Sequence, residues 1–212
     1  MYNDKYEKEN RYYQNAKQRR DRKKKPSRRP SRSRSRGKVY PSKKSMETIQ
    51  RLSPPEDVNG VRRFLGLVGY LSKFIRDYAS LVRPLQGLIT AEDFVWSESC
   101  QNSFDSVKKV LSEAQLSLYL PQPHLPFCLD TDASTYAIAG VLQQTEGDKV
   151  HVLQFASKKL TTAESKWPIY ELEAYAVVRS IFHFAHYLRG KEFVYREVTG
   201  CQVGYVSSGI SV

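Results

Sequence analysis

Residues 127–134 read Phe127-Cys128-Leu129-Asp130-Thr131-Asp132-Ala133-Ser134, an apolar run that ends on a carboxylate. A second apolar run, which contains a glycine, follows over residues 136–143. Two such runs joined by a short polar segment are typical of a β-hairpin. A third run, over residues 150–157, comes after the turn Glu146-Gly147-Asp148. The stretch therefore predicts an antiparallel meander that presents Asp132 at a strand end.

A long helix and a fourth strand are expected to follow the meander. Between residues 169 and 188, apolar side chains recur at helical spacing, and Gly190 is placed to end the helix. Residues 193–195 then form another apolar run, which a helical crossover would place parallel to the first strand. The pattern predicts an α/β (α+β) fold, with a mixed sheet and packed helices.

Two more helices are predicted upstream of the sheet. Ser53-Pro54-Pro55-Glu56-Asp57 has the prolines and acids that favour a helix start. A further helix is expected after Ser97, a residue suited to cap it. Its apolar stripe consists of Cys100, Phe104, Val107 and Leu111. These positions predict a helical region whose apolar faces pack in a core.

The positive charge of the chain is concentrated at its N-terminal end. The chain has 212 residues and a formal net charge of +12, and residues 1–45 carry 18 Lys and Arg against 4 Asp and Glu. Apolar side chains are scarce there, so little burial can offset the entropy of ordering. We predict a disordered Arg/Ser-rich tail. Its candidate nucleic-acid contacts are Arg22, Lys23, Lys24, Lys25, Arg28, Arg29, Arg32, Arg34 and Arg36.

Four segments are therefore expected. They are the tail (1–45), a helical region (46–120), a partial α/β domain (121–195) and an unstructured, divergent end (196–212). No apolar run approaches the roughly 20 residues of a membrane span, so a membrane partner is not expected. The three cysteines are isolated in the sequence, which favours reduced thiols in an intracellular protein.

Several ordered motifs resemble one known family. They include Thr131-Asp132-Ala133-Ser134, Phe155-Ala156-Ser157-Lys158-Lys159-Leu160-Thr161, Glu171-Leu172-Glu173 and His186-Tyr187-Leu188-Arg189-Gly190. Together they look like the ribonuclease H-like domain of reverse transcriptases from LTR retrotransposons of the gypsy type. Upstream, Arg62-Arg63-Phe64-Leu65-Gly66-Leu67-Val68-Gly69-Tyr70 resembles the segment that joins the polymerase palm to that domain. The resemblance covers roughly residues 43 to 195 and implies an origin in a Pol polyprotein.

The resemblance implies two-metal hydrolysis of RNA in an RNA–DNA hybrid, with Mg²⁺ or Mn²⁺ as the cofactor. It assigns Asp132 as the central carboxylate and Glu173 as the helical one, both catalytic and metal-binding. Glu171 is a rival, but it lies about 200° from Glu173 around a helix, so the two cannot reach the same metals. We interpret Asp130 as a solvated residue. His183 and His186 could also ligate a metal, but no third ligand is evident.

Two of the four family carboxylates have no counterpart here. The place of the third reads Arg196-Glu197-Val198-Thr199, where Val198 aligns with the family's aspartate and Glu197 comes one position early. The fourth belongs to a later helix that this chain does not reach, and the last strand of the fold is also expected to be absent, leaving an unpaired sheet edge. A polymerase Tyr-x-Asp-Asp turn is not found. We expect little or no nuclease activity and no DNA synthesis.

Two alternatives remain open. In the first, the chain is a nucleic-acid or partner-binding protein that acts through its basic tail, because Lys and Arg release counterions when they bind phosphates. The Arg-Ser alternation at residues 31–36 resembles the repeats of splicing-related proteins, and residues 22–25 could direct the chain to the nucleus. In the second, the chain is an inactive structural remnant.

Overall fold

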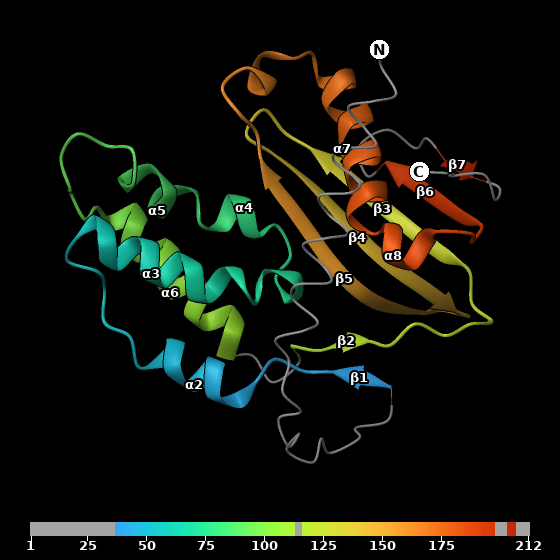
Figure 1. Cartoon of the computed structure of the whole chain (residues 1–212), viewed down its shortest axis with the longest axis horizontal. Coiled ribbons are helices and arrows are strands. Elements are labelled where there is room, and N and C mark those ends of the chain that lie inside the picture. The colour runs from blue at the N-terminus through green and yellow to red at the C-terminus, as the bar shows by residue number, and fades with distance from the viewer. Residues whose placement is uncertain (1–36, 113–115, 198–202, 207–212) are drawn as a thin grey trace, which may run out of the picture. The chain divides into compact units, whose positions relative to one another are not determined.

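The computed structural model describes residues 37–112, 116–197 and 203–206. They form a helical region followed by a five-stranded sheet with helices packed on it (Figure 1). This confirms the predicted α/β class with a mixed sheet and packed helices. Among the described residues, no helix has the length and apolarity needed to cross a lipid bilayer.

The helical region contains five α-helices and one 3₁₀ turn among the described residues. They are α2 (Lys43–Gln50), α3 (Val58–Gly69), η1 (Ser72–Phe74), α4 (Tyr78–Leu81), α5 (Arg83–Leu88) and α6 (Glu98–Ser112). Helix α3 begins at Val58, just after the predicted start at residues 53–57, and the Asp57 carboxylate caps it by accepting a hydrogen bond from the Gly60 N–H at 2.6 Å. The short helices α4 and α5 were not predicted; each is too brief to show a helical period in the sequence.

A single apolar core joins these helices. The predicted stripe of α6, which is Cys100, Phe104, Val107 and Leu111, is buried there. Phe104 meets Phe64 of α3 with ring centroids 4.7 Å apart. Just before the start of α6, Ser97 Oγ lies 3.4 Å from the backbone nitrogen of Cys100, as the predicted capping role of Ser97 requires. The core accounts for why the two long helices form, since isolated helices of this length are marginal in water.

The sheet has the strand order β5-β4-β3-β6-β7. Its strands are β3 (Phe127–Ala133), β4 (Ala137–Glu146), β5 (Lys149–Lys159), β6 (Phe193–Glu197) and β7 (Val203–Val206). The first three form the predicted antiparallel meander, and β6 lies parallel to β3 with Phe193 beside Phe127. Gly147 turns the chain between β4 and β5 with a φ of +59°, a conformation that glycine adopts without strain.

Helices α7 (Ile169–His183) and α8 (Ala185–Leu188) pack on β3 and β4 and are preceded by the 3₁₀ turn η2 (Glu164–Lys166) (Figure 1). The sequence predicted one helix over 169–188, but the backbone bends at Phe184, with φ −93° and ψ 10°. The Phe184 ring is fully buried against Leu129, Leu142 and Leu188. Gly190 follows with a φ of +69°, as its predicted role as a helix stop requires.

The divergent C-terminal segment is more ordered than predicted. Strand β6 continues to Glu197, and β7 pairs antiparallel with it, Val206 lying opposite Phe193. Residues 203–206 read Val-Gly-Tyr-Val, and valine and tyrosine favour strands. The prediction of an unstructured end from residue 196 is therefore wrong for 196–197 and 203–206. The edge of β6 expected to be unpaired is covered by β7.

The ordered part also starts earlier than predicted. Strand β1 (Lys38–Val39) pairs with β2 (Leu118–Tyr119), and α2 begins at Lys43, so the boundary at residue 45 is wrong. The helical region and the sheet are in contact, because the Ala79 N–H of α4 donates to Ser157 Oγ of β5 at 3.0 Å. The predicted disorder and the nine candidate cations of residues 22–36 lie outside the described residues.

Candidate functional site

Asp132 lies near the carboxyl end of β3, where the sequence placed it. Its backbone pairs with Ala139 of β4, and its side chain is exposed to solvent. The turn that follows is fixed by Ser134, whose Oγ donates to the Ala137 carbonyl at 2.9 Å and accepts from the Ala137 N–H at 3.1 Å. A serine that closes the turn in this way holds the strand end, and with it Asp132, in place.

The packing of α7 shows which face of the sheet Asp132 occupies. Gly140 lies opposite Thr131, and a Cβ at Gly140 would collide with Ser180 Oγ of α7. Residues that lie opposite each other across a pair of strands share a face, so Thr131 faces α7 as well. Side chains alternate along a strand, which places Asp132 on the face away from α7.

Glu173 lies in the first half of α7, at the same end of the sheet. Leu172, the residue before it, packs with Ala133 and Ile138. Tyr175 marks the flank of α7 that faces β5, since its hydroxyl accepts from Lys158 Nζ at 2.8 Å. Glu173 is about 100° from Leu172 on the other flank, toward β3, and is half-buried. Glu171 is exposed, in agreement with its predicted divergence from Glu173.

The structure brings the two predicted carboxylates to one end of the sheet but on opposite faces. In the parts of the chain that the structure describes, no group of three or more His, Cys, Asp or Glu side chains could hold a metal ion. The parallel pairing of β3 with β6 ends at Thr131, which lies beside Glu197. Val198, which the resemblance aligns with the third carboxylate, lies outside the described residues.

Asp130 is not the solvated residue that the sequence suggested. Its carboxylate accepts from Arg196 Nε at 2.8 Å, from Arg196 Nη2 at 3.1 Å and from Gln143 Nε2 at 2.7 Å. Burial, and then the charge of Asp130, raise the pKa of the neighbouring Cys128 thiol to about 11. The ion pair joins β3 to β6 across their parallel register and leaves Asp130 engaged by protein groups.

A second polar group, which the sequence reading missed, lies on the α7 face of β5. Lys158 Nζ donates to Glu164 Oε1 at 2.6 Å and to the Tyr175 hydroxyl at 2.8 Å. Glu164 also accepts from the Thr161 N–H at 2.7 Å. These bonds, that of Lys158 first, lower the pKa of Glu164 from 4.5 to about 2. The Thr-x-x-Glu spacing of residues 161–164 is the signal of a capping box and could have revealed half of this network.

Comparisons with known proteins place these features in a family. Residues 96–195 match the RNase H-like domain found in reverse transcriptase. The Pol polyprotein of transposon 412 from Drosophila melanogaster is 32% identical over 156 residues, which are 73% of this chain and 12% of that polyprotein. The Gag-Pol polyprotein of woolly monkey sarcoma virus is 38% identical over 132 residues, 61% of this chain and 8% of the relative.

Solved structures show the same fold. The foamy viral protease-reverse transcriptase in complex with an RNA/DNA hybrid matches with a TM-score of 0.56 at 18% identity, over 68% of this chain and 20% of that one. The same enzyme in complex with double-stranded DNA matches with a TM-score of 0.54 at 19% identity, over 68% of this chain and 30% of that one. The present chain spans a small part of each of these relatives.

Proposed function

Because residues 96–195 form the RNase H-like domain found in reverse transcriptase, in a chain homologous to Pol polyproteins, we propose that this chain binds RNA–DNA hybrids and hydrolyses them weakly or not at all. Support for the substrate class comes from the foamy viral enzyme, whose structure holds such a hybrid. The gypsy-type origin stays a prediction, which the relatives from Drosophila transposons favour.

The observation that supports the proposal of weak activity is the separation of the acidic residues. A two-metal site needs several carboxylates on one point, because Mg²⁺ demands a near-octahedral shell of oxygen ligands. Here Asp132 and Glu173 lie on opposite faces of the sheet, and Asp130 already binds Arg196 and Gln143. RNase H-like domains generally use divalent metals, but the described residues do not fit a Mg²⁺ or Mn²⁺ pair. We therefore assign no step of hydrolysis to a bound metal.

A second function is favoured by the charge of the chain. Residues 1–45 carry most of the excess of Lys and Arg, so we propose that this tail supplies much of the affinity for nucleic acid. Each phosphate contact on duplex DNA would make the slope of log affinity against log salt more negative by about 0.9. The remainder of a Pol polyprotein is a further proposed partner, since the relatives are polyproteins.

Fluorescence anisotropy with a labelled RNA–DNA hybrid tests both proposals in the full chain. The chain is titrated in chelator at several salt concentrations, beside a variant in which the nine cations between Arg22 and Arg36 are replaced by Gln. We expect the wild type to bind and the variant to bind more weakly, with a flatter salt slope. Equal salt slopes for the two proteins would exclude the tail as a source of affinity for nucleic acid. A folded wild type that does not bind the hybrid at low salt would contradict the main proposal.

A further inference from the structure

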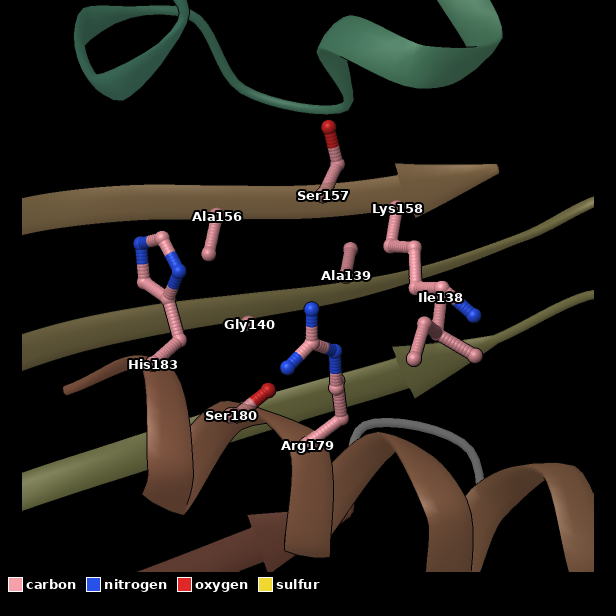
Figure 2. Close-up of a pocket in the computed structure, with 9 residues that line it drawn as sticks. All are labelled: Ile138, Ala139, Gly140, Ala156, Ser157, Lys158, Arg179, Ser180 and His183. Atoms are coloured by element: carbon pink, nitrogen blue, oxygen red, sulfur yellow. The ribbon is translucent and has the colours of Figure 1, made fainter. Parts of the chain in front are cut away.

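A cavity of about 160 Å³ lies between α7 and the strands β4 and β5 (Figure 2). None of the residues that line it is acidic, whereas three carry basic side chains. The full lining consists of Ile138, Ala139, Gly140, Ala156, Ser157, Lys158, Arg179, Ser180 and His183. This volume is well above the roughly 10–15 Å³ that a single water requires, so it admits a small polyatomic group.

The floor of the cavity depends on small residues. Gly140 has no side chain, and an added Cβ there would come 2.9 Å from Ser180 Cβ and 3.5 Å from the Phe184 ring. Ala156 lies opposite Gly140 on β5. The absence of a side chain at Gly140 lets Ser180 of α7 approach β4 closely, and Figure 2 shows Arg179 and His183 extending from α7 toward these strands.

The positive charge at the cavity is only partly balanced. Lys158 is engaged by Glu164 and Tyr175. Arg179 is exposed and makes no hydrogen bond or ion pair with any of the described residues. His183 Nε2 lies 3.1 Å from Gln154 Nε2. Burial, and then the charges of His186 and Arg179, lower the pKa of His183.

We propose that this cavity binds a phosphate group, held by the Arg179 guanidinium and the His183 imidazole beside Lys158. A planar guanidinium matches phosphate oxygens with two parallel hydrogen bonds. A bound anion also relieves the repulsion between Arg179 and His183. The phosphate comes either from the backbone of a bound hybrid or from the free ion. Only the first of these two sources rests on the proposed function.

The NMR titration of His183 in the full chain tests the site directly. An anion beside the ring favours its protonated form, so inorganic phosphate is expected to raise the pKa of His183. Sulfate, whose charge is constant over this pH range, serves as the matched anion and is expected to do the same. A His183→Gln variant assigns the resonance among the four histidines.

Arg179→Gln and Arg189→Gln form a matched pair of charge changes. Arg189 ends α8, is exposed and does not line the cavity. We expect Arg179→Gln to weaken phosphate binding about tenfold, as the loss of a charged hydrogen-bonding partner implies, and Arg189→Gln to leave it unchanged. An unmoved His183 titration with phosphate, sulfate and hybrid, or equal effects of the two variants, would overturn the site.

Titration with a labelled hybrid distinguishes the two sources. If backbone phosphate is the ligand, the hybrid raises the pKa of His183, and Arg179→Gln weakens hybrid binding more than Arg189→Gln does. If only the free ions move His183 while the hybrid binds elsewhere, the cavity is a site for the free anion. If the wild type binds no hybrid but phosphate still moves His183, the proposed function fails and the cavity site stands.

Discussion

The two flanks of α7 differ in whether their polar side chains lie close enough to interact with one another. On the flank toward β3, Glu173 shares an end of the sheet with Asp132, but the strand alternation puts the two carboxylates on opposite faces. On the flank toward β5, Lys158, Glu164 and Tyr175 form a closed hydrogen-bond network beside the cavity lined by Arg179 and His183. The groups proposed to bind an anion thus lie together, whereas the two carboxylates predicted to bind metal ions lie on opposite faces of the sheet.

One buried face of α7 supports both flanks. Leu172, Ala176 and Ser180 lie along it and are buried against the sheet, and Phe184 continues the line where the helix bends. A disturbance of this face should affect both flanks together, whereas a change on one flank should leave the other intact. Variants on the buried face and variants on a single flank are therefore expected to give different results.

The largest effect is expected from Phe184→Ala. The ring is fully buried among Leu129, Leu142 and Leu188, so its removal should cost about 3–5 kcal/mol in the free energy of unfolding. Phe182→Ala makes the same chemical change at a side chain that is 53% exposed, and it should stay within about 0.5 kcal/mol of wild type. Urea unfolding measures both. Equal losses would mean that the bend at Phe184 does not anchor α7.

The next largest effect is expected from Gly140→Ala. The new methyl group would meet Ser180 at less than van der Waals distance and force α7 away from β4, at a cost of about 1–3 kcal/mol. Gly66→Ala is the matched control, because an added Cβ there meets nothing within 4 Å and alanine favours the helix by up to about 1 kcal/mol. Thermal unfolding of the pair should therefore show shifts of opposite sign. A stabilising Gly140→Ala would contradict the close packing.

A smaller effect, which is complete above pH 4.5 and fades at acidic pH, is expected from Glu164→Gln. The folded pKa of Glu164 lies at about 2, below its ordinary value of 4.5. A carboxyl of this kind stabilises the fold fully above pH 4.5 and loses that contribution as the pH falls toward 2. The variant should lose stability at neutral pH and flatten the pH dependence between these limits, as unfolding at several pH values would show.

Glu171→Gln is the control for that change, since Glu171 is an exposed glutamate in the first turn of α7, close in sequence to the η2 turn that holds Glu164. It should leave the pH dependence of stability as in wild type. If both variants flatten the dependence of stability on pH equally, the contact between Lys158 and Glu164 is not the cause of that dependence.

The smallest effect on stability is expected from Asp130→Asn, because its partner Arg196 is 47% exposed and such ion pairs contribute about 0.2–1 kcal/mol. Its clearer consequence is chemical. Loss of the Asp130 charge should lower the pKa of Cys128 from about 11 and speed its alkylation at pH 8, because the thiolate is the reactive form. Peptide mapping after iodoacetamide treatment measures this rate. Asp148→Asn, in the exposed turn before β5, should leave it unchanged.

Local patterns were enough to predict the elements that a short segment determines. Alternation and turn residues predicted the meander over 127–157, and Gly190 marked a helix end that the structure confirms. The bend at Phe184 could not be predicted, because it depends on how one buried ring fits a cluster built from four strands and α8. β7 was missed because only its pairing with β6 identifies it as a strand.

The candidate site was predictable only in part. Sequence motifs identified Asp132 and Glu173, and their roles stay predictions. The pairing of Asp130 with Arg196 depends on a parallel register between strands more than sixty residues apart, which no local pattern specifies. The cavity likewise needs small residues from β4 and β5 to meet cations of α7, so it emerged only from the fold.

Cleavage of a labelled RNA–DNA hybrid is the most direct test of the central claim that the carboxylates are too dispersed for catalysis. The folded wild type and Asp132→Asn would be compared in Mg²⁺ and in Mn²⁺, with circular dichroism confirming that both are folded. We predict that the two proteins give the same weak or undetectable cleavage. Clear cleavage by the wild type that is lost in Asp132→Asn would show a working site at Asp132 and contradict the account.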